Sequence, residues 1–190
     1  MRLLLLAPPG AGKGTQGVRI AEAYGIAHLA SGDLLRDEVA SGTKLGLEAK
    51  AYMDRGDLVP DDRVTAMVLR AVLKAPEGWV LDGYPRTLAQ AEAAYDWARD
   101  RTLTFHAVVY LDVPEAELVD RLLGRAKIEG RADDDEPTIR NRLQVFKRET
   151  APLVEYYRGR DVLVEVDATG PVDEVTERVL SALKPFDPAE

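Results

Sequence analysis

A run of four leucines that ends in a glycine-rich turn is the feature that most restricts how this chain can fold. The leucines occupy residues 3–6, and residues 7–15 read Ala-Pro-Pro-Gly-Ala-Gly-Lys-Gly-Thr. An apolar run that stops at Pro and Gly and leads into a helical pattern predicts a buried parallel strand, which delivers backbone N–H groups to a helix N-terminus. Such N–H groups bind phosphate, so the sequence predicts a phosphate-binding loop. An ordinary glycine-rich turn is the alternative that this motif alone leaves open.

Each residue type in this loop suits a polyphosphate ligand. We expect Gly10, Gly12 and Gly14 to bring the backbone close to an anion and to adopt positive φ angles. We expect Lys13 to place its charge on the β- and γ-phosphates, and Thr15 to offer its hydroxyl to Mg²⁺. The loop therefore favours a nucleoside triphosphate that binds together with magnesium.

The loop departs in two places from the common pattern G-x-x-x-x-G-K-[ST]. Ala7 stands where that pattern has its first glycine, and Gly14 separates the lysine from Thr15. Because Ala7 continues the strand, we expect a negative φ there and a loop that still works. A dinucleotide-binding fingerprint is less favoured, since Lys13 lies inside the glycine run and no further G-x-x-G spacing completes it.

Composition narrows the possible functions. At 190 residues the chain is long enough for one sizeable core, and one domain is the default. A net charge of −8 disfavours a broad surface for nucleic acid or acidic membrane, so anion binding must come from local clusters. The chain has no cysteine and only two histidines, His28 and His106, which disfavours disulfides, thiol nucleophiles and zinc sites. Neither a signal-peptide pattern nor an apolar span of about 18 residues is present, which predicts a cytoplasmic protein.

Strand patterns alternate with helical patterns along the whole chain. After the first strand, further strands are expected at 26–30, 79–81, 108–111 and 162–166. Helices are expected at 13–24, 34–39, 45–55, 64–74, 87–99, 112–125, 138–149, 153–157 and 172–183. This alternation predicts an α/β fold with a five-stranded parallel sheet flanked by helices and a site at the carboxyl ends of the strands. Residues 31–60 carry little apolar surface and favour a mobile flap, although a plain helical crossover fits their composition equally well.

Two further features add candidate residues for anion and metal binding. Asp82 follows a predicted buried strand, and an acidic residue at that place beside a phosphate loop is expected to hold Mg²⁺ and its waters. An aspartate that merely forms a turn is the alternative. Arg121 and Arg125 are four residues apart, so both project from one helix face, either toward a site or toward solvent.

Taken together, these motifs resemble the adenylate kinase family, in the bacterial form whose lid is short. The phosphate loop at 9–16, the segment Ser-Gly-Asp-Leu-Leu-Arg at 31–36 and the loop at 56–62 are similar to family motifs. So are the segment Leu-Asp-Gly-Tyr-Pro-Arg-Thr at 81–87 with Gln90, the segment 130–134 with Arg142, and residues 150–157. These motifs follow the family's order, and the similarity extends from residue 1 to about residue 183.

The resemblance implies a P-loop nucleoside-triphosphate-binding fold in one domain. The core would comprise residues 1–30, 61–125 and 137–190. A mobile insertion that binds the nucleoside monophosphate (NMP) would occupy residues 31–60, and a short lid would occupy residues 126–136. The implied activity is reversible transfer of the terminal phosphoryl group from MgATP to AMP, which gives two ADP. The implied protein is a cytoplasmic monomer that needs Mg²⁺ but no zinc, and that binds neither nucleic acid nor membrane.

The resemblance also implies a role for each matching position. The residues expected to bind ATP are Gly10, Ala11, Gly12, Lys13, Gly14, Thr15, Arg121, Arg125 and Gly170. The residues expected to bind AMP are Ser31, Arg36, Asp57, Leu58, Val59, Gly83, Tyr84, Pro85, Arg86, Gln90, Arg131 and Arg142. The residues expected to act in catalysis are Lys13, Arg86, Arg121, Arg125, Arg131 and Arg142, and Thr15 and Asp82 would hold Mg²⁺ through waters.

Three positions depart mildly from the family pattern. Ser31 replaces the usual Thr, Asp62 the usual Glu and Phe146 the usual Tyr. The alternatives within enzymes are a kinase for UMP or CMP and a kinase with GTP as donor. Gln90, together with Ser31, favours adenine at the acceptor site, since an amide can pair with the N1 and N6 edge of that base.

An alternative from another class is an ATP-binding regulator without catalysis on the same fold. Lys13, Asp82 and the arginines are all present, which disfavours it.

Overall fold

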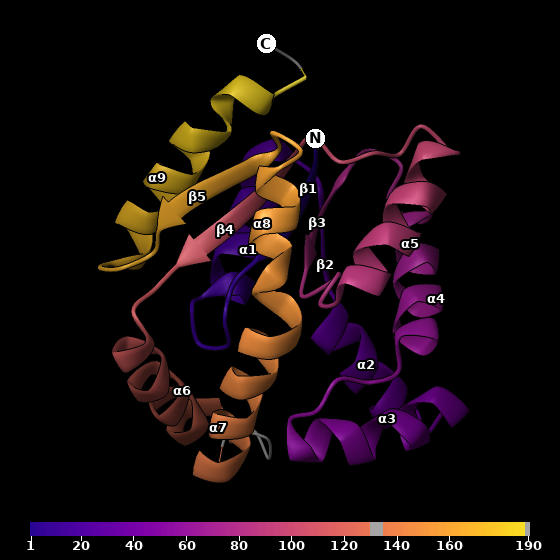
Figure 1. The fold of residues 1–190 in the computed structure, drawn as a ribbon, viewed down its shortest axis with the longest axis vertical. Coiled ribbons are helices and arrows are strands. Elements are labelled where there is room, and N and C mark those ends of the chain that lie inside the picture. The colour runs from indigo at the N-terminus through magenta and orange to yellow at the C-terminus, as the bar shows by residue number, and fades with distance from the viewer. Residues whose placement is uncertain (130–134, 189–190) are drawn as a thin grey trace.

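The computed structural model describes residues 1–129 and 135–188, with side chains omitted at 125–129. Five parallel strands form one sheet in the order β2-β3-β1-β4-β5, with helices on both faces (Figure 1). The strands are β1 (Arg2–Leu6), β2 (Ala27–Ala30), β3 (Trp79–Asp82), β4 (Ala107–Asp112) and β5 (Leu163–Asp167). The predicted fold class is therefore confirmed.

The helices follow the predicted ones within a few residues. They are α1 (Lys13–Tyr24), α2 (Ser31–Ala40), α3 (Lys44–Arg55), α4 (Asp61–Val72), α5 (Leu88–Arg99), α6 (Glu115–Glu129), α7 (Glu136–Val145), α8 (Pro152–Arg158) and α9 (Val172–Leu183). A π-helical turn, η1 (Phe146–Thr150), joins α7 to α8, and a short 3₁₀ turn, η2 (Lys184–Phe186), follows α9.

The boundaries of α6 and α7 differ most from the prediction. Asp112 ends β4 instead of beginning a helix, and α6 extends to Glu129 where the sequence predicted an end at 125. Residues 126–129 therefore belong to a helix, and α7 already begins at Glu136. The predicted lid residues 130–134 lie outside the described residues.

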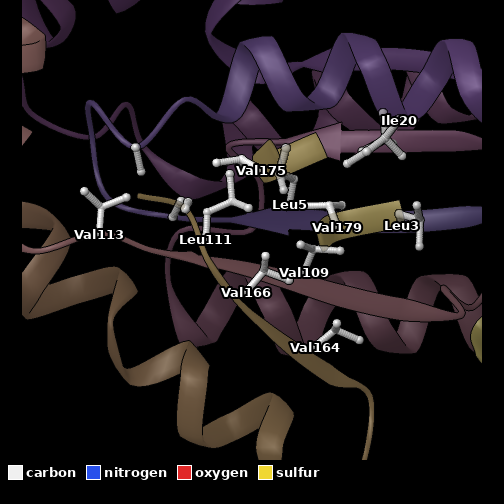
Figure 2. Packing of buried hydrophobic residues seen from close by; sticks show 14 of the residues in the cluster. Leu3, Leu5, Ile20, Val109, Leu111, Val113, Val164, Val166, Val175 and Val179 are labelled. Carbon is white, nitrogen blue, oxygen red and sulfur yellow. The ribbon is translucent and has the colours of Figure 1, made fainter. Parts of the chain in front are cut away.

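Strand β1 explains why a plain run of leucines is the organising element. Successive side chains of a strand point to opposite faces, so Leu3 and Leu5 enter one core while Leu4 and Leu6 enter the other. Figure 2 shows Leu3 and Leu5 with Ile20 of α1 and with valines of β4, β5 and α9. A parallel strand covered on both faces needs apolar residues at every position.

Residues 31–60 form a helical insertion between β2 and α4, which contains α2 and α3. Helices α2 and α3 lie at the same end of the molecule as α6 and α7 (Figure 1), and α3 packs beside α7. Helices α2 and α3 pack so closely that a Cβ on Gly46 would lie only 2.1 Å from the carbonyl oxygen of Glu38. Among the described residues, no helix is both long enough and apolar enough to cross a bilayer.

Candidate active site

A cleft of about 600 Å³ lies where β1 and β3 end, between the phosphate loop, α2, the loop after α3 and α7. Most of the residues predicted to bind nucleotide line it. They are Gly10, Gly12, Lys13, Gly14, Thr15, Ser31, Arg36, Asp57, Leu58, Val59, Asp82, Gly83, Pro85, Arg86, Gln90, Arg121 and Arg142. The sequence thus identified residues that are far apart in the chain and share one cavity.

The phosphate loop has the geometry of an anion-binding turn. Gly10 and Gly12 both have a φ of +87°, in the left-handed region that only glycine adopts at low cost. Gly12 directly precedes the first turn of α1. The backbone N–H groups of that turn have no partner within the helix and are available to an anion. Gly14 differs from the prediction, because it already lies in the helix and its φ is outside that region. Ala7 also lies outside that region, as expected, and it is buried.

The ammonium group of Lys13 is anchored on its own loop. Its Nζ donates to the carbonyl oxygens of Ala7, at 2.8 Å, and of Pro8, at 3.1 Å. These bonds hold a cation at the wall of the cleft beside the N-terminus of α1. Two sources of positive potential are thereby combined at one place.

Asp82 occupies the position that the sequence predicted. Strand register pairs it with Leu5 of β1, so its carboxylate stands beside the beginning of the phosphate loop. A Cβ on Gly14 would lie 4.0 Å from its Oδ2. Thr15 lines the same cavity. A hydroxyl and a carboxylate are oxygen donors of the kind that Mg²⁺ prefers when phosphates and waters supply its other ligands.

His28 is a neighbour of Asp82 that the sequence did not connect with the site. Its Nε2 lies 3.7 Å from Oδ2 of Asp82 and has no hydrogen-bond partner among the described residues. The ring packs on α1, where a Cβ on Gly17 would lie 2.5 Å from Nε2. The strand register is consistent with this contact. Strands β2 and β3 are adjacent, Ala30 is opposite Asp82, and His28 lies two residues before Ala30 on the same face of the sheet.

Three arginines, Arg36, Arg86 and Arg142, line the part of the cleft that also contains Gly83. Arg86 remains exposed as a residue, yet the protein atoms packed around its guanidinium desolvate that group and lower its pKa. The nearby charges of Arg142 and Arg36 lower it further, while Asp82 acts in the opposite direction. Arg36 also forms an ion pair with Asp33. Like charges that the fold brings together favour an anion between them, and phosphate matches guanidinium geometry.

The main chain around Arg86 is fixed by neighbours on both sides. Its carbonyl oxygen accepts from Thr150 Oγ1 at 2.8 Å, and its Nε donates to the carbonyl oxygen of Gly83 at 2.8 Å. That same carbonyl accepts from Ser31 Oγ at 2.7 Å. Gly83 has a φ of +74°, and a Cβ there would lie 2.8 Å from Ser31 Oγ. Glycine is therefore required by both conformation and space.

Gln90 is almost fully buried, and its amide has partners at both ends. Its Nε2 donates to Asp61 Oδ1 at 2.7 Å, and its Oε1 accepts from the backbone N–H of Arg86 at 2.7 Å. The Thr87 hydroxyl donates to Asp61 Oδ2 at 2.8 Å and caps α5 by accepting from the backbone N–H of Gln90. The sequence predicted Gln90 but not Asp61, since its motif drew attention to Asp62 instead.

The loop after α3 is attached to α7. Asn141 Nδ2 donates to the carbonyl oxygen of Arg55, at 2.7 Å, and to Asp57 Oδ1, at 2.8 Å. The hydrogen bond from Asn141, followed by that from Arg55, lowers the pKa of Asp57. The sequence gave no sign of Asn141, which sits next to the predicted residue Arg142.

Arg121 of α6 lines the cleft. It donates to the carbonyl oxygen of Ala168, at 3.2 Å from Nη2, and pairs with Glu117 at 3.0 Å. The first contact places its guanidinium beside the loop that contains Gly170. The side chain of Arg125 and the whole of Arg131 lie outside the described residues.

Three predicted residues are not in the lining of the cleft. Tyr84 is buried in the core, its hydroxyl donates to Thr65 Oγ1 at 3.0 Å, and burial raises its pKa. Its side chain therefore faces away from the cleft, although the adjacent Gly83 and Pro85 line it. Ala11 is buried within the loop, and Gly170 follows β5 outside the lining.

Comparison with known proteins agrees with this arrangement. The family model described as adenylate kinase matches residues 5–162. A protein named adenylate kinase from Synechococcus sp. (strain CC9902) is 50% identical over 184 residues, which cover 96% of this chain and 98% of the relative. One from Stenotrophomonas maltophilia (strain R551-3) is 49% identical over 97% of this chain and 100% of the relative. One from Thermobifida fusca (strain YX) is 48% identical over 97% and 98%.

Proposed function

The chain belongs to the adenylate kinase family, and we propose that its cleft holds MgATP and AMP together for direct transfer of a phosphoryl group. The reaction is the reversible transfer of the terminal phosphoryl group from ATP to AMP, which gives two ADP and maintains the balance of adenine nucleotides. One observation carries the assignment of the cleft. The phosphate loop and a separate guanidinium cluster line the same cavity, so two phosphate chains can face each other.

The donor side is the part of the cleft around the phosphate loop. The backbone of residues 10–15 and the ammonium of Lys13 would hold the phosphates of ATP. Arg121 supports this placement, because its guanidinium reaches from α6 to the loop after β5. Gly170 in that loop would lie near the adenine, and Arg125 would add a second cation from α6.

Thr15 and Asp82 would hold Mg²⁺ on this side, largely through waters. The ion, when bound with ATP, neutralises phosphate charge and fixes the orientation of the transferred group. The residues fit such an ion because both offer oxygen donors at the foot of the phosphate loop.

The acceptor side is the part of the cleft around Gly83. The guanidinium groups of Arg36, Arg86 and Arg142 would hold the phosphate of AMP. The base would lie against Gln90, with Ser31, Asp57, Leu58 and Val59 forming the adjoining wall together with Gly83 and Pro85.

The chemistry needs no general base, because the attacking oxygen of the AMP phosphate is already an anion. The main barrier is repulsion between two charged phosphate chains. Lys13, Arg86, Arg121 and Arg142 would offset that repulsion, joined by Arg125 and Arg131. Exclusion of water matters equally, since water competes with AMP for the phosphoryl group.

We infer that one chain binds both nucleotides and acts as a monomer. The test uses a bisubstrate mimic in which two adenosines are joined through five phosphates. Calorimetry should find one molecule bound per chain, because donor and acceptor sides share one cleft. Two independent sites, or no binding, would contradict the proposal.

The identity of the acceptor base needs its own experiment. A coupled assay with ATP and each of AMP, UMP, CMP and GMP should show a preference for AMP. A preference for a pyrimidine would favour a UMP or CMP kinase, whereas binding of ATP without any turnover would favour a regulator without catalysis.

A further inference from the structure

We propose that Asp61 is a specificity-determining positioning residue, which holds the amide of Gln90 in the one orientation that accepts adenine and rejects guanine and hypoxanthine. The inference rests on the proposed function, in which Gln90 faces the base of the acceptor nucleotide. The inference concerns a residue, Asp61, that does not itself line the cleft. Asp61 would act through Gln90 and, together with the backbone N–H of Arg86, it would decide which end of that amide is the donor.

The two ends of a glutamine amide have almost the same shape, so the partners decide which end is which. A carboxylate can only accept, and Asp61 Oδ1 lies 2.7 Å from one end of the amide. A backbone N–H can only donate, and that of Arg86 lies 2.7 Å from the other end. A reversed amide would place oxygen against oxygen and N–H against N–H at these distances, so both partners oppose reversal.

Asp61 is itself held in place. Its second oxygen, Oδ2, accepts from the Thr87 hydroxyl at 2.8 Å. The same hydroxyl accepts from the backbone N–H of Gln90 at 3.1 Å. These three residues form a closed ring of hydrogen bonds between the first turns of α4 and α5. A carboxylate fixed by both oxygens cannot turn aside to let the amide reverse.

The fixed amide keeps one N–H and one oxygen lone pair for a ligand, because each end uses one bond inside the protein. Adenine offers an acceptor at N1 and a donor at its 6-amino group, which match this pair. Guanine and hypoxanthine offer a donor at N1 and an acceptor at O6, which match only the reversed amide. A buried amide that cannot reverse leaves polar atoms unpaired with these bases, and such mismatches discriminate strongly.

The experiment measures kcat/KM for AMP and for IMP, whose base is hypoxanthine, with ATP as donor. Asp61→Asn replaces a group that only accepts with one that either accepts or donates, so it removes one of the two partners that oppose reversal of the Gln90 amide and leaves only the backbone N–H of Arg86 against it. We expect the ratio of kcat/KM for AMP to that for IMP to fall about tenfold or more. The change should appear mainly in KM for the two acceptors, with KM for ATP close to that of the unmodified protein.

Asp62→Asn is the matched control. Asp62 is the next residue of the same helical turn, it is exposed, and it lies near Arg63 rather than Gln90. This variant removes the same charge from the start of α4 and should keep the ratio of the unmodified protein. An equal change in both variants would mean that the charge at the start of α4 matters, and that the proposal is wrong.

Thr87→Val gives a second measurement if Asp61→Asn does not fold. It removes the hydroxyl that fixes Asp61, so the AMP to IMP ratio should fall in the same direction by a smaller factor, while Thr87→Ser should keep the ratio. Equal losses with AMP and IMP in both Asp61→Asn and Thr87→Val would show a purely structural role and overturn the proposal.

Gln90→Ala separates this inference from the function on which it rests. If the preference for AMP is lost in Gln90→Ala but kept in Asp61→Asn, Gln90 reads the base and Asp61 does not hold it. If the preference survives in Gln90→Ala, the proposed contact between Gln90 and the base is itself wrong.

Discussion

At the proposed phosphate end of the cleft the charges of Arg142 and Arg36 lower the pKa of Arg86, whereas at the proposed base end the Gln90 amide is already bonded at both ends. In the first region the three guanidinium groups repel one another, and an anionic ligand would offset that repulsion. The second region has its polar atoms paired before any ligand arrives. Both lie in one cleft and share Arg86, whose side chain belongs to one region and whose backbone N–H belongs to the other.

This difference indicates how affinity and selectivity are divided. An arrangement of like charges costs folding free energy, and that cost is recovered when an anion binds. A preformed hydrogen-bond ring recovers little on binding, but it penalises a base with the wrong pattern. The phosphate end should therefore dominate binding and rate, and the base end should dominate choice among acceptors.

Removing a cation from the phosphate end should give the largest effect. Arg86→Ala should lower kcat/KM by roughly a hundredfold to a thousandfold, equally for AMP, CMP and UMP, because all three present the same phosphate. Its thermal unfolding temperature should fall little, because relief of like-charge repulsion offsets the lost bond to Gly83. Steady-state assays with three acceptors and a thermal melt test both expectations. A loss confined to AMP would break the comparison, since Arg86 would then read the base.

Asp82→Asn should give the next largest effect, also at the phosphate end. It should lower turnover by about tenfold to a hundredfold while leaving the binding of ATP without Mg²⁺ largely intact, because the carboxylate acts on the metal. Calorimetry with and without Mg²⁺, beside a magnesium titration of the rate, separates the two quantities. An unchanged dependence on Mg²⁺ would place the metal elsewhere.

A change at the base end should be smaller and selective. Gln90→Ala should lower kcat/KM for AMP by roughly tenfold to a hundredfold, which corresponds to about 1–3 kcal/mol for a buried polar group left unpaired. UMP use should fall less, because the amide does not suit its base. If all acceptors fall equally, the base end contributes only structure, and the contrast between the two ends disappears.

The smallest effect should come from the contact that attaches the loop after α3 to α7. Asn141→Ala removes two hydrogen bonds and should raise KM for AMP by about twofold to tenfold, with KM for ATP unchanged. Because this contact lowers the pKa of Asp57, its contribution is complete above the unfolded pKa of 3.8 and is lost as pH falls through the lower folded value. Acid unfolding of the two proteins should therefore converge only at low pH.

The phosphate loop, Asp82 and Gln90 could be predicted because each belongs to a short continuous motif. Asp61 and Asn141 could not, since their partners are 29 and 84 residues away and only the packed fold brings them together. Local pattern also misjudged Gly14: the predicted helix 13–24 already contains this residue, and a glycine inside a helix has no positive φ. Tyr84 shows a further limit, since a motif residue can serve the core while its neighbours serve the cleft.

The double attachment of Arg86 has a consequence for nucleotide length. Its backbone N–H holds the group that would read the base, and its guanidinium would hold the phosphate. One residue therefore sets the distance between the contact to the base and the contact to the phosphate. Thr150 donates to the carbonyl of the same residue, which holds its backbone in place. On the proposed assignment, the acceptor side measures the distance from base to phosphate and fits a nucleoside monophosphate.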